Sequence, residues 1–173
     1  VAAVDIDQAR VKDFCAVHGI GHAYTRTEDA LQNHSFDAAG IVTPDARHAE
    51  PSLLCLNAGL AVLCEKPLSD SVESSLRMVE AAQASGLLNM VNLSYRVSGA
   101  LHQARQWVDQ GRLGQVRHVE ASYRQSWLCS PYWGDWKTEE AWLWRLSKQH
   151  GSMGVLGDIG IHILDYVTTS VGL

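Results

Sequence analysis

The sequence has no long hydrophobic run and no strong excess of charge of either sign. Its longest apolar stretches, such as residues 59–64, have the length of a β-strand and are far too short to span a bilayer. The formal net charge of −5 is modest, and the basic residues form no stripe of the kind that binds nucleic acid. We therefore expect neither a membrane nor a nucleic acid among the partners of this protein.

Cysteine is also scarce. The four cysteines include no C-x-x-C pair, and three of them stand in strongly apolar surroundings. This pattern favours buried thiols in a reducing compartment over a disulfide framework, so we expect a cytoplasmic protein.

Two familiar features are missing near the start of the sequence. Neither an initiator methionine nor a signal peptide precedes residues 1–6, which form an apolar strand-like run. The motif G-x-G-x-x-G is absent, and Gly19-Ile20-Gly21 is no substitute because it ends a helix instead of opening one. We interpret the chain as a segment of a longer polypeptide, and we expect an earlier strand and a phosphate-binding loop upstream of Val1.

What the sequence does contain is an alternation of short apolar runs with amphipathic segments. The runs predict strands buried on both faces, at 1–6, 36–43, 60–64 and 87–93. The segments between them predict helices, one capped by Asp7 and ending at Gly19, one capped by Thr27, and others at 49–57 and from Ser69 or Asp70 to 84. This predicts an α/β fold, a Rossmann-type doubly wound parallel sheet whose first strand is missing, with residues 1–95 as the dinucleotide-binding domain.

The pattern changes after residue 96. Residues 100–109 predict an amphipathic helix, and residues 116–126 alternate as in a strand of a sheet with one wet face. A loop with five of the six tryptophans comes next, and a helix over 159–170 closes the chain. The five tryptophans are Trp127, Trp133, Trp136, Trp142 and Trp144. We interpret residues 96–173 as the start of a second domain.

Ligands of doubly wound sheets bind beyond the carboxyl ends of the strands. Asp5 lies at such an end, where an acidic residue accepts hydrogen bonds from the adenosine ribose. The alternative is that Asp5 caps the following helix, but Asp7 is better placed for that role. Because Asp5 would repel a 2′-phosphate, we expect NAD to be preferred to NADP. Lys66 ends another strand, between Glu65 and Pro67, and is either a catalytic or polarising cation or a solvated partner of Glu65.

A second group of titratable residues lies near the end of the chain. Asp158 and His162 are four residues apart and share one face of a helix, with Asp165 one turn further along. Together with Lys66 they are suited to moving a proton on or off a hydroxyl. Metal binding is the alternative. The Gly-x-x-Gly frame of 157–160 suggests a flat ligand instead, so we predict no metal site.

Trp144 and Arg145 come just before this motif. Aromatic faces and planar hydrogen-bonding groups suit sugar rings, so this pair is the best candidate among the tryptophan-rich residues to line a pocket. We expect some of the other tryptophans to be packing residues.

Taken together, these motifs resemble the glucose-fructose oxidoreductase, inositol dehydrogenase and rhizopine catabolism (Gfo/Idh/MocA) family. The resemblance runs along the whole chain, through Asp5, Val42-Thr43-Pro44, His48, Glu65-Lys66-Pro67, Tyr95-Arg96 and residues 157–165. It implies NAD or NADP beside Asp5, Thr43, Pro44, His48, Glu65, Lys66 and Pro67. It also implies that residues 96–173 begin an α/β domain with an open, mainly antiparallel sheet, which carries the substrate site and the contacts of a homodimer or homotetramer.

The activity that this resemblance implies is an NAD(P)-dependent oxidoreductase acting on a sugar, a cyclitol or a related polyol. Catalysis is expected from Lys66, Asp158 and His162, with His162 as the general base and Lys66 stabilising the reacting oxygen. Substrate contacts are expected from Tyr95, Arg96, Trp144, Arg145, Asp158 and His162. Two alternatives remain, an NAD-dependent glycoside hydrolase of the same family and a non-catalytic binding or regulatory protein on this scaffold. Retention of all three catalytic residues argues against the latter.

Overall fold

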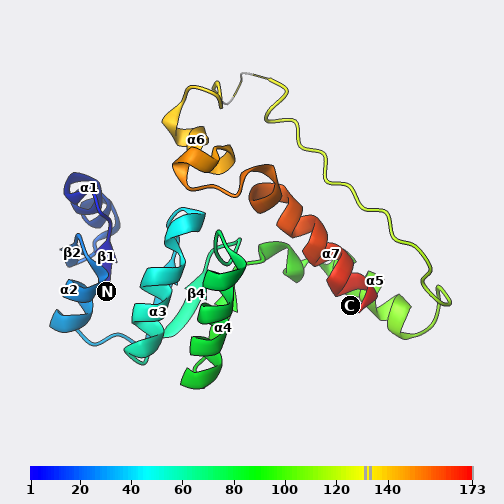
Figure 1. Cartoon of the computed structure of the whole chain (residues 1–173), viewed down its shortest axis with the longest axis horizontal. Coiled ribbons are helices and arrows are strands. Elements are labelled where there is room, and N and C mark those ends of the chain that lie inside the picture. The colour runs from blue at the N-terminus through cyan, green and yellow to red at the C-terminus, as the bar shows by residue number, and fades with distance from the viewer. Residues whose placement is uncertain (131, 133, 173) are drawn as a thin grey trace.

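The computed structural model describes residues 1–130, 132 and 134–172, so Trp133 of the tryptophan-rich loop lies outside the described residues. Strands and helices alternate in the first half of the chain, as predicted (Figure 1). The strands are β1 (Ala2–Val4), β2 (His22–Tyr24), β3 (Ala38–Ile41), β4 (Ala61–Cys64) and β5 (Asn89–Val91). The helices are α1 (Gln8–His18), α2 (Thr27–Asn33), α3 (Ala49–Asn57) and α4 (Val72–Ser85).

All strand pairs are parallel, but they form two sheets where one was expected. β1 pairs with β2, and β3, β4 and β5 form a separate three-stranded sheet in that order. The order of a Rossmann sheet places its first strand between these two pieces. The division therefore has the form expected of a chain that enters the sheet at its second strand. β2 was not predicted, because its three residues, His-Ala-Tyr, form no apolar run.

Helices α3 and α4 cover one face of the β3–β5 sheet (Figure 1). The core beneath them consists of Ile41, Cys55, Leu56, Leu60, Val62, Cys64 and Met78. Side chains of the opposite face stay accessible, with Leu63 44% and Met90 60% exposed. The prediction of strands buried on both faces is therefore wrong for this sheet in the described part of the chain, where alternate side chains point away from the two helices.

Three of the four cysteines are buried and all four are free, in agreement with the prediction. Burial raises the pKa of the Cys64 thiol to about 11. A thiol with so high a pKa is almost entirely protonated at neutral pH and therefore unreactive. Cys64 thus acts as a packing residue of the core.

The helix ends agree with the prediction at some positions and differ at others. Asp7 caps α1 by accepting hydrogen bonds from the backbone N–H groups of Ala9 and Arg10. Thr27 does not cap α2, because it already lies inside the helix and its predecessor makes no side-chain cap bond. α4 is capped by Ser71, one or two residues later than predicted, through the N–H of Ser74.

The second half of the chain is dominated by helices. α5 (Gly99–Asp109) packs along α7 (Ile161–Val171), and α6 (Glu140–Leu146) lies near the start of α7 (Figure 1). A π-helical turn, η5 (Leu156–Gly160), leads directly into α7. Short 3-10 helices occupy Asp45–Arg47 (η1), Ser94–Val97 (η2) and Lys148–His150 (η4). Within the described ranges, none of these helices combines the length and apolarity that crossing a membrane requires.

The strand predicted over residues 116–126 is not formed. These residues are extended and largely exposed, and no described strand pairs with them (Figure 1). A strand is stabilised by the N–H and C=O groups of a neighbouring strand, and the described residues offer none here. The open antiparallel sheet of the second domain is therefore absent from the described residues.

Candidate active site

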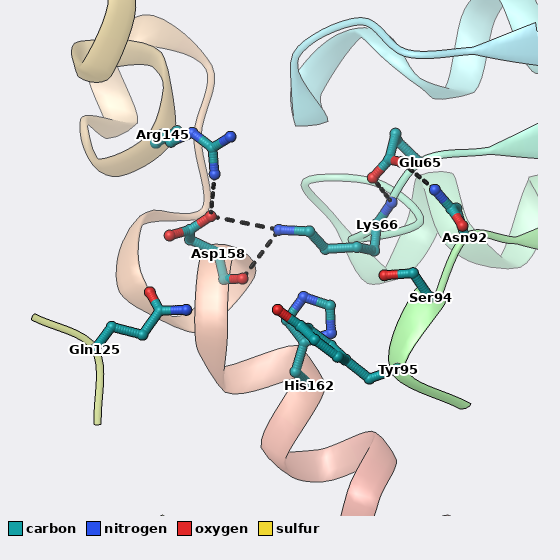
Figure 2. A pocket seen from close by; sticks show the side chains of 9 residues that line it. All are labelled: Glu65, Lys66, Asn92, Ser94, Tyr95, Gln125, Arg145, Asp158 and His162. Atoms are coloured by element: carbon teal, nitrogen blue, oxygen red, sulfur yellow. Dashed lines mark hydrogen bonds and ion pairs between the residues drawn. The ribbon is translucent and has the colours of Figure 1, made fainter. Parts of the chain in front are cut away.

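A pocket lies where the carboxyl ends of β4 and β5 meet the turn before α7 (Figure 2). It is lined by Glu65, Lys66, Asn92, Ser94, Tyr95, Gln125, Arg145, Asp158 and His162. Their side chains are all polar, and five of them carry acidic or basic groups: Glu65, Lys66, Arg145, Asp158 and His162. The structure thus brings the lysine after β4 together with the Asp/His pair predicted to face it.

Lys66 is held by two acceptors of a single residue. Its Nζ donates to the main-chain oxygen of Asp158 at 2.9 Å and lies 3.4 Å from the Oδ1 atom of Asp158. The two side chains are only 17% and 9% exposed. Asp158 belongs to the π-helical turn, a local widening that is frequent at functional sites. A protonated lysine has three N–H donors, so one remains free for a ligand.

The alternative interpretation, in which Lys66 is solvated and paired with Glu65, does not describe the structure. Glu65 instead accepts a hydrogen bond from the backbone N–H of Lys66 at 3.1 Å. Its other oxygen accepts from the side-chain amide of Asn92. Glu65 therefore connects the ends of β4 and β5 and leaves the ammonium to Asp158.

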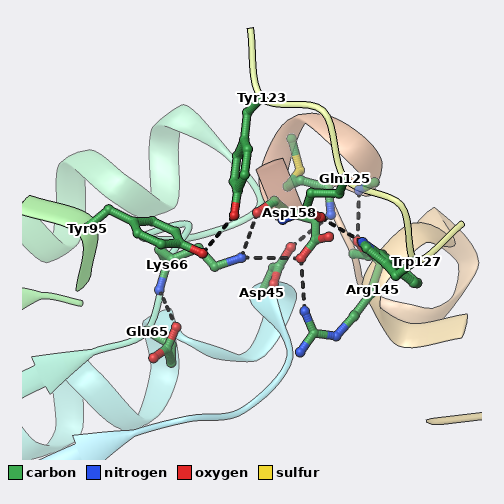
Figure 3. A network of polar contacts seen from close by, with 12 residues as sticks. Asp45, Glu65, Lys66, Tyr95, Tyr123, Gln125, Trp127, Arg145 and Asp158 are labelled. Atoms are coloured by element: carbon green, nitrogen blue, oxygen red, sulfur yellow. Dashed lines mark hydrogen bonds and ion pairs between the residues drawn. The ribbon is translucent and has the colours of Figure 1, made fainter. Parts of the chain in front are cut away.

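Arg145 is the second cation on Asp158. Its Nη1 lies 3.1 Å from the Oδ1 atom that also faces Lys66 (Figure 3). The guanidinium is stacked over the ring of Trp144, at 4.8 Å from the centroid, and lies 5.9 Å from that of Trp142. Trp144 is thus not part of the pocket lining, but its ring packs against the Arg145 guanidinium and stabilises its position. The Asp158 carboxylate is thus paired with two cations.

His162 is buried on the first turn of α7, 7% exposed, on the same side of the helix as Asp158. Burial lowers the pKa of His162, and the positive charge of Lys66 lowers it further. The ring is therefore neutral at neutral pH and can accept a proton. Its Nδ1 has no hydrogen-bond partner among the described residues, whereas most buried polar atoms have one.

Aromatic rings enclose the histidine. Tyr95 meets His162 edge-on with ring centroids 4.7 Å apart, and its hydroxyl lies 2.9 Å from that of Tyr123. The hydrogen bond with Tyr123 and burial raise the pKa of Tyr95 to about 12, while the same bond lowers the pKa of Tyr123. Tyr95 thus stays protonated at neutral pH, and it can form a wall of the pocket but cannot act as a base.

His48 lies behind the site and does not line the pocket. It is fully buried, with Nδ1 2.8 Å from the carbonyl oxygen of Pro67 and Nε2 2.7 Å from that of Thr43. A neutral imidazole has one N–H, so both contacts are hydrogen bonds only when the ring is doubly protonated. His48 connects the ends of β3 and β4. Direct contact of His48 with the cofactor remains a prediction.

A close contact at Gly157 fixes the turn before α7 against Pro67. A Cβ atom there would lie 2.5 Å from the Cβ of Met153 and 3.3 Å from the Cγ of Pro67. Asp45 supports the same segment by accepting a hydrogen bond from the N–H of Met153 at 2.9 Å. Only glycine allows this close approach, and the approach brings Asp158 within reach of Lys66, the residue before Pro67.

Two predicted site residues lie in ion pairs outside this pocket. Arg96 donates from Nε to Oδ1 of the buried Asp165 at 2.5 Å, so its charge is directed to the flank of α7 instead of the pocket. Asp5 accepts from the N–H of Asp7 at 2.8 Å and lies 3.6 Å from the guanidinium of Arg10. The predicted roles of Arg96 toward substrate and of Asp5 and Pro44 toward cofactor remain predictions.

Four residues at the site had not been singled out. Asn92 and Ser94 lie in the stretch after β5 that strand-end reasoning points to, and a polar residue there is the signal that could have identified them. Tyr123 and Gln125 belong to the extended segment, and their spacing of two places both side chains on one side.

No group of three or more possible metal ligands occurs in the part of the chain that is described.

Parallel strands with intervening helices form a Rossmann-type fold, and the lysine after β4 faces an Asp/His pair. Residues 1–93 match the oxidoreductase family with an NAD-binding Rossmann fold, and residues 101–172 match the GFO/IDH/MocA C-terminal domain. The chain belongs to the Gfo/Idh/MocA family.

Similar proteins of known activity include levoglucosan dehydrogenase from Pseudarthrobacter phenanthrenivorans, 31% identical over 76% of this chain and 32% of that protein. Trans-1,2-dihydrobenzene-1,2-diol dehydrogenase from Sus scrofa is 33% identical over 99% of this chain and 48% of that protein. The crystal structure of an oxidoreductase domain protein from Kribbella flavida matches with a TM-score of 0.83 and 34% identity, over 99% of this chain and 44% of that chain. The chain thus spans a third to a half of the length of these curated relatives.

Proposed function

We propose that the intact protein is an NAD(P)-dependent oxidoreductase acting on the hydroxyl or carbonyl carbon of a sugar, cyclitol or related polyol. The observation that carries this proposal is the ammonium of Lys66, held by Asp158 in one polar pocket with the neutral His162. These groups supply a hydrogen-bond donor and a proton acceptor for a single hydroxyl.

Each residue has a distinct role in this proposal. His162 takes the proton from the substrate hydroxyl, because burial and Lys66 keep its ring neutral. The third N–H of Lys66 donates to the same oxygen and stabilises the negative charge that develops on it. Asp158 is a positioning residue. Its main-chain oxygen and its Oδ1 atom accept the other two N–H groups of Lys66 and so hold the ammonium in place.

The charges of the lining support a neutral substrate. Lys66 and Arg145 are balanced by Glu65 and Asp158, so the pocket offers no net charge to a carboxylate or a phosphate. Asn92, Ser94 and Gln125 add groups that can bond hydroxyls, and the Tyr95 ring offers a face to apolar C–H groups. A polyhydroxylated ring presents both kinds of surface.

The cofactor fits these residues in part. The nicotinamide supplies the acceptor for a hydride when it is bound. Asp5, at the end of β1, offers a carboxylate for a ribose, and Arg10 beside it weakens the repulsion toward a 2′-phosphate. This sequence contains no glycine-rich loop whose backbone N–H groups would bind the phosphates of the cofactor. Because the Asp5 carboxylate repels a 2′-phosphate, we propose NAD as the preferred cofactor, with NADP as the alternative.

The remaining features of the proposal derive from the family. They are a cofactor domain at residues 1–95, a substrate and oligomerisation domain beginning at residue 96, and a homodimer or homotetramer. The match of residues 1–93 and 101–172 to two separate family domains supports this division. A cytoplasmic location is proposed separately, from the free and mostly buried cysteines.

The test is oxidation of a panel of polyols by the intact protein with NAD and with NADP. Levoglucosan, scyllo-inositol and trans-1,2-dihydrobenzene-1,2-diol are suitable members, because relatives are named for activity on them. We expect one molecule of reduced cofactor per molecule of ketone formed. Release of a sugar from a glycoside without net cofactor reduction would identify the glycoside hydrolase instead. Failure of all these reactions would refute the proposal.

A further inference from the structure

We propose that Gln125 determines substrate specificity by donating a hydrogen bond from its side-chain amide to a second oxygen, beside the carbon that reacts. Trp127 acts as the positioning residue that fixes the orientation of this amide. The inference rests on the proposed function and narrows its substrate class to vicinal diols, in which neighbouring carbons both carry oxygen.

The orientation of the Gln125 amide follows from the chemistry of its neighbour. The indole Nε1 of Trp127 lies 2.7 Å from Oε1 of Gln125 (Figure 3). An indole N–H can only donate, so the atom facing it must be the amide oxygen and not the nitrogen. The two ends of an amide are ordinarily hard to tell apart, but this partner settles the choice.

With the oxygen occupied, the nitrogen of Gln125 is directed into the pocket. In Figure 2 the nitrogen of the Gln125 amide points toward the centre of the pocket, between Asp158 and His162. A hydrogen bond from Gln125 also helps to lower the pKa of Tyr123. The amide group has two N–H donors, so one remains for a ligand after Tyr123 is satisfied.

Trp127 is itself anchored to the element that carries Arg145. Its ring lies 5.3 Å from that of Trp142 on α6, in a tilted arrangement. The rings of Trp142 and Trp127 thus connect Gln125 to α6 and hold its side chain at the pocket. They do so although the segment of Gln125 pairs with no strand in the described residues. This anchoring reduces the conformational freedom that a substrate would otherwise have to restrict.

Two donors from different segments favour a substrate that carries two oxygens. Lys66 and His162 serve the reacting oxygen, and Gln125 comes from a different segment with an N–H that these residues do not use. A polyol with oxygen on the neighbouring carbon satisfies both donors at once. An analogue without that oxygen leaves the Gln125 donor unpaired, which costs transition-state stabilisation.

The test compares substrates and variants in the intact protein. The parent substrate is the polyol that the wild type oxidises fastest, and the analogues are its monodeoxy forms at the carbons next to the oxidised one. For wild type we expect kcat/KM to fall at least tenfold for one of these analogues. Gln125→Leu should abolish most of this discrimination by slowing the parent and not the analogue. Gln103→Leu, the same change on the exposed face of α5, should leave it unchanged.

Trp127→Phe tests the positioning role, because it keeps the ring and removes the N–H. We expect it to weaken the discrimination without a loss of folding by circular dichroism, while Trp107→Phe on α5 retains it. Full discrimination in the Gln125→Leu variant would overturn the inference and leave the proposed function intact. Absence of any polyol oxidation by the wild type would overturn the proposed function itself, and this inference with it.

Discussion

Replacing Lys66 with Met removes the ammonium while keeping an unbranched side chain of similar length. Asp158 would lose one of its two cationic partners but would keep Arg145 at 3.1 Å, so its carboxylate would not be left unpaired. We therefore expect the variant to fold. Loss of one preorganised donor to a developing oxyanion typically lowers kcat by about 10²- to 10³-fold, and we expect a decrease of this size.

The same variant should change the pH dependence in a defined direction. A base must be unprotonated to act, so activity is lost as the pH falls through the pKa of His162. In the wild type that pKa lies below the ordinary value of 6.5, because of burial and then the charge of Lys66. Removing the charge raises the pKa, so the acidic limb of the kcat/KM profile should move to higher pH.

Steady-state kinetics of the intact protein across the acidic and neutral range would measure both effects. Lys148→Met is a matched control, since Lys148 is exposed on η4 and lies outside the pocket. An acidic limb that does not move in Lys66→Met, or a kcat within a few-fold of wild type, would refute the electrostatic link between Lys66 and His162.

Two further predictions concern the cofactor and the turn before α7. Asp5 should make kcat/KM higher with NAD than with NADP, and a clear preference for NADP in steady-state kinetics would contradict its assigned role. Gly157→Ala should destabilise the fold by about 1–3 kcal/mol, because its Cβ would lie 2.5 Å from that of Met153. Gly40→Ala, where nothing lies within 4 Å of the added atom, is the control in thermal unfolding; equal midpoints for the two variants would show that the turn can adjust.

The sequence allowed much of the first half of the fold to be predicted, because its signals are local. Helix α3 has the predicted bounds, and Asp7 caps α1 as expected. The meeting of Lys66 with Asp158, 92 residues apart, followed from two rules: ligand sites lie at strand ends, and residues four apart share a helix face.

Features that depend on non-local partners could not be predicted. The alternation over residues 116–126 is correct for a strand, yet a strand also needs a neighbour, which local pattern does not reveal. The contact between Trp127 and Gln125 depends on side-chain orientation in a segment without regular structure. The enclosure of His48 between two carbonyls depends on how β3 and β4 end side by side.

The central claim is that Lys66 and His162 act as one unit on a single hydroxyl. It is tested most directly by kcat for polyol oxidation in Lys66→Met, in His162→Asn and in the double variant. Effects within one catalytic unit are strongly non-additive, so the double variant should be little slower than the slower single variant. Near-wild-type turnover in both single variants, with the fold intact by circular dichroism, would place the chemistry elsewhere. Fully additive losses would show that the two residues act independently.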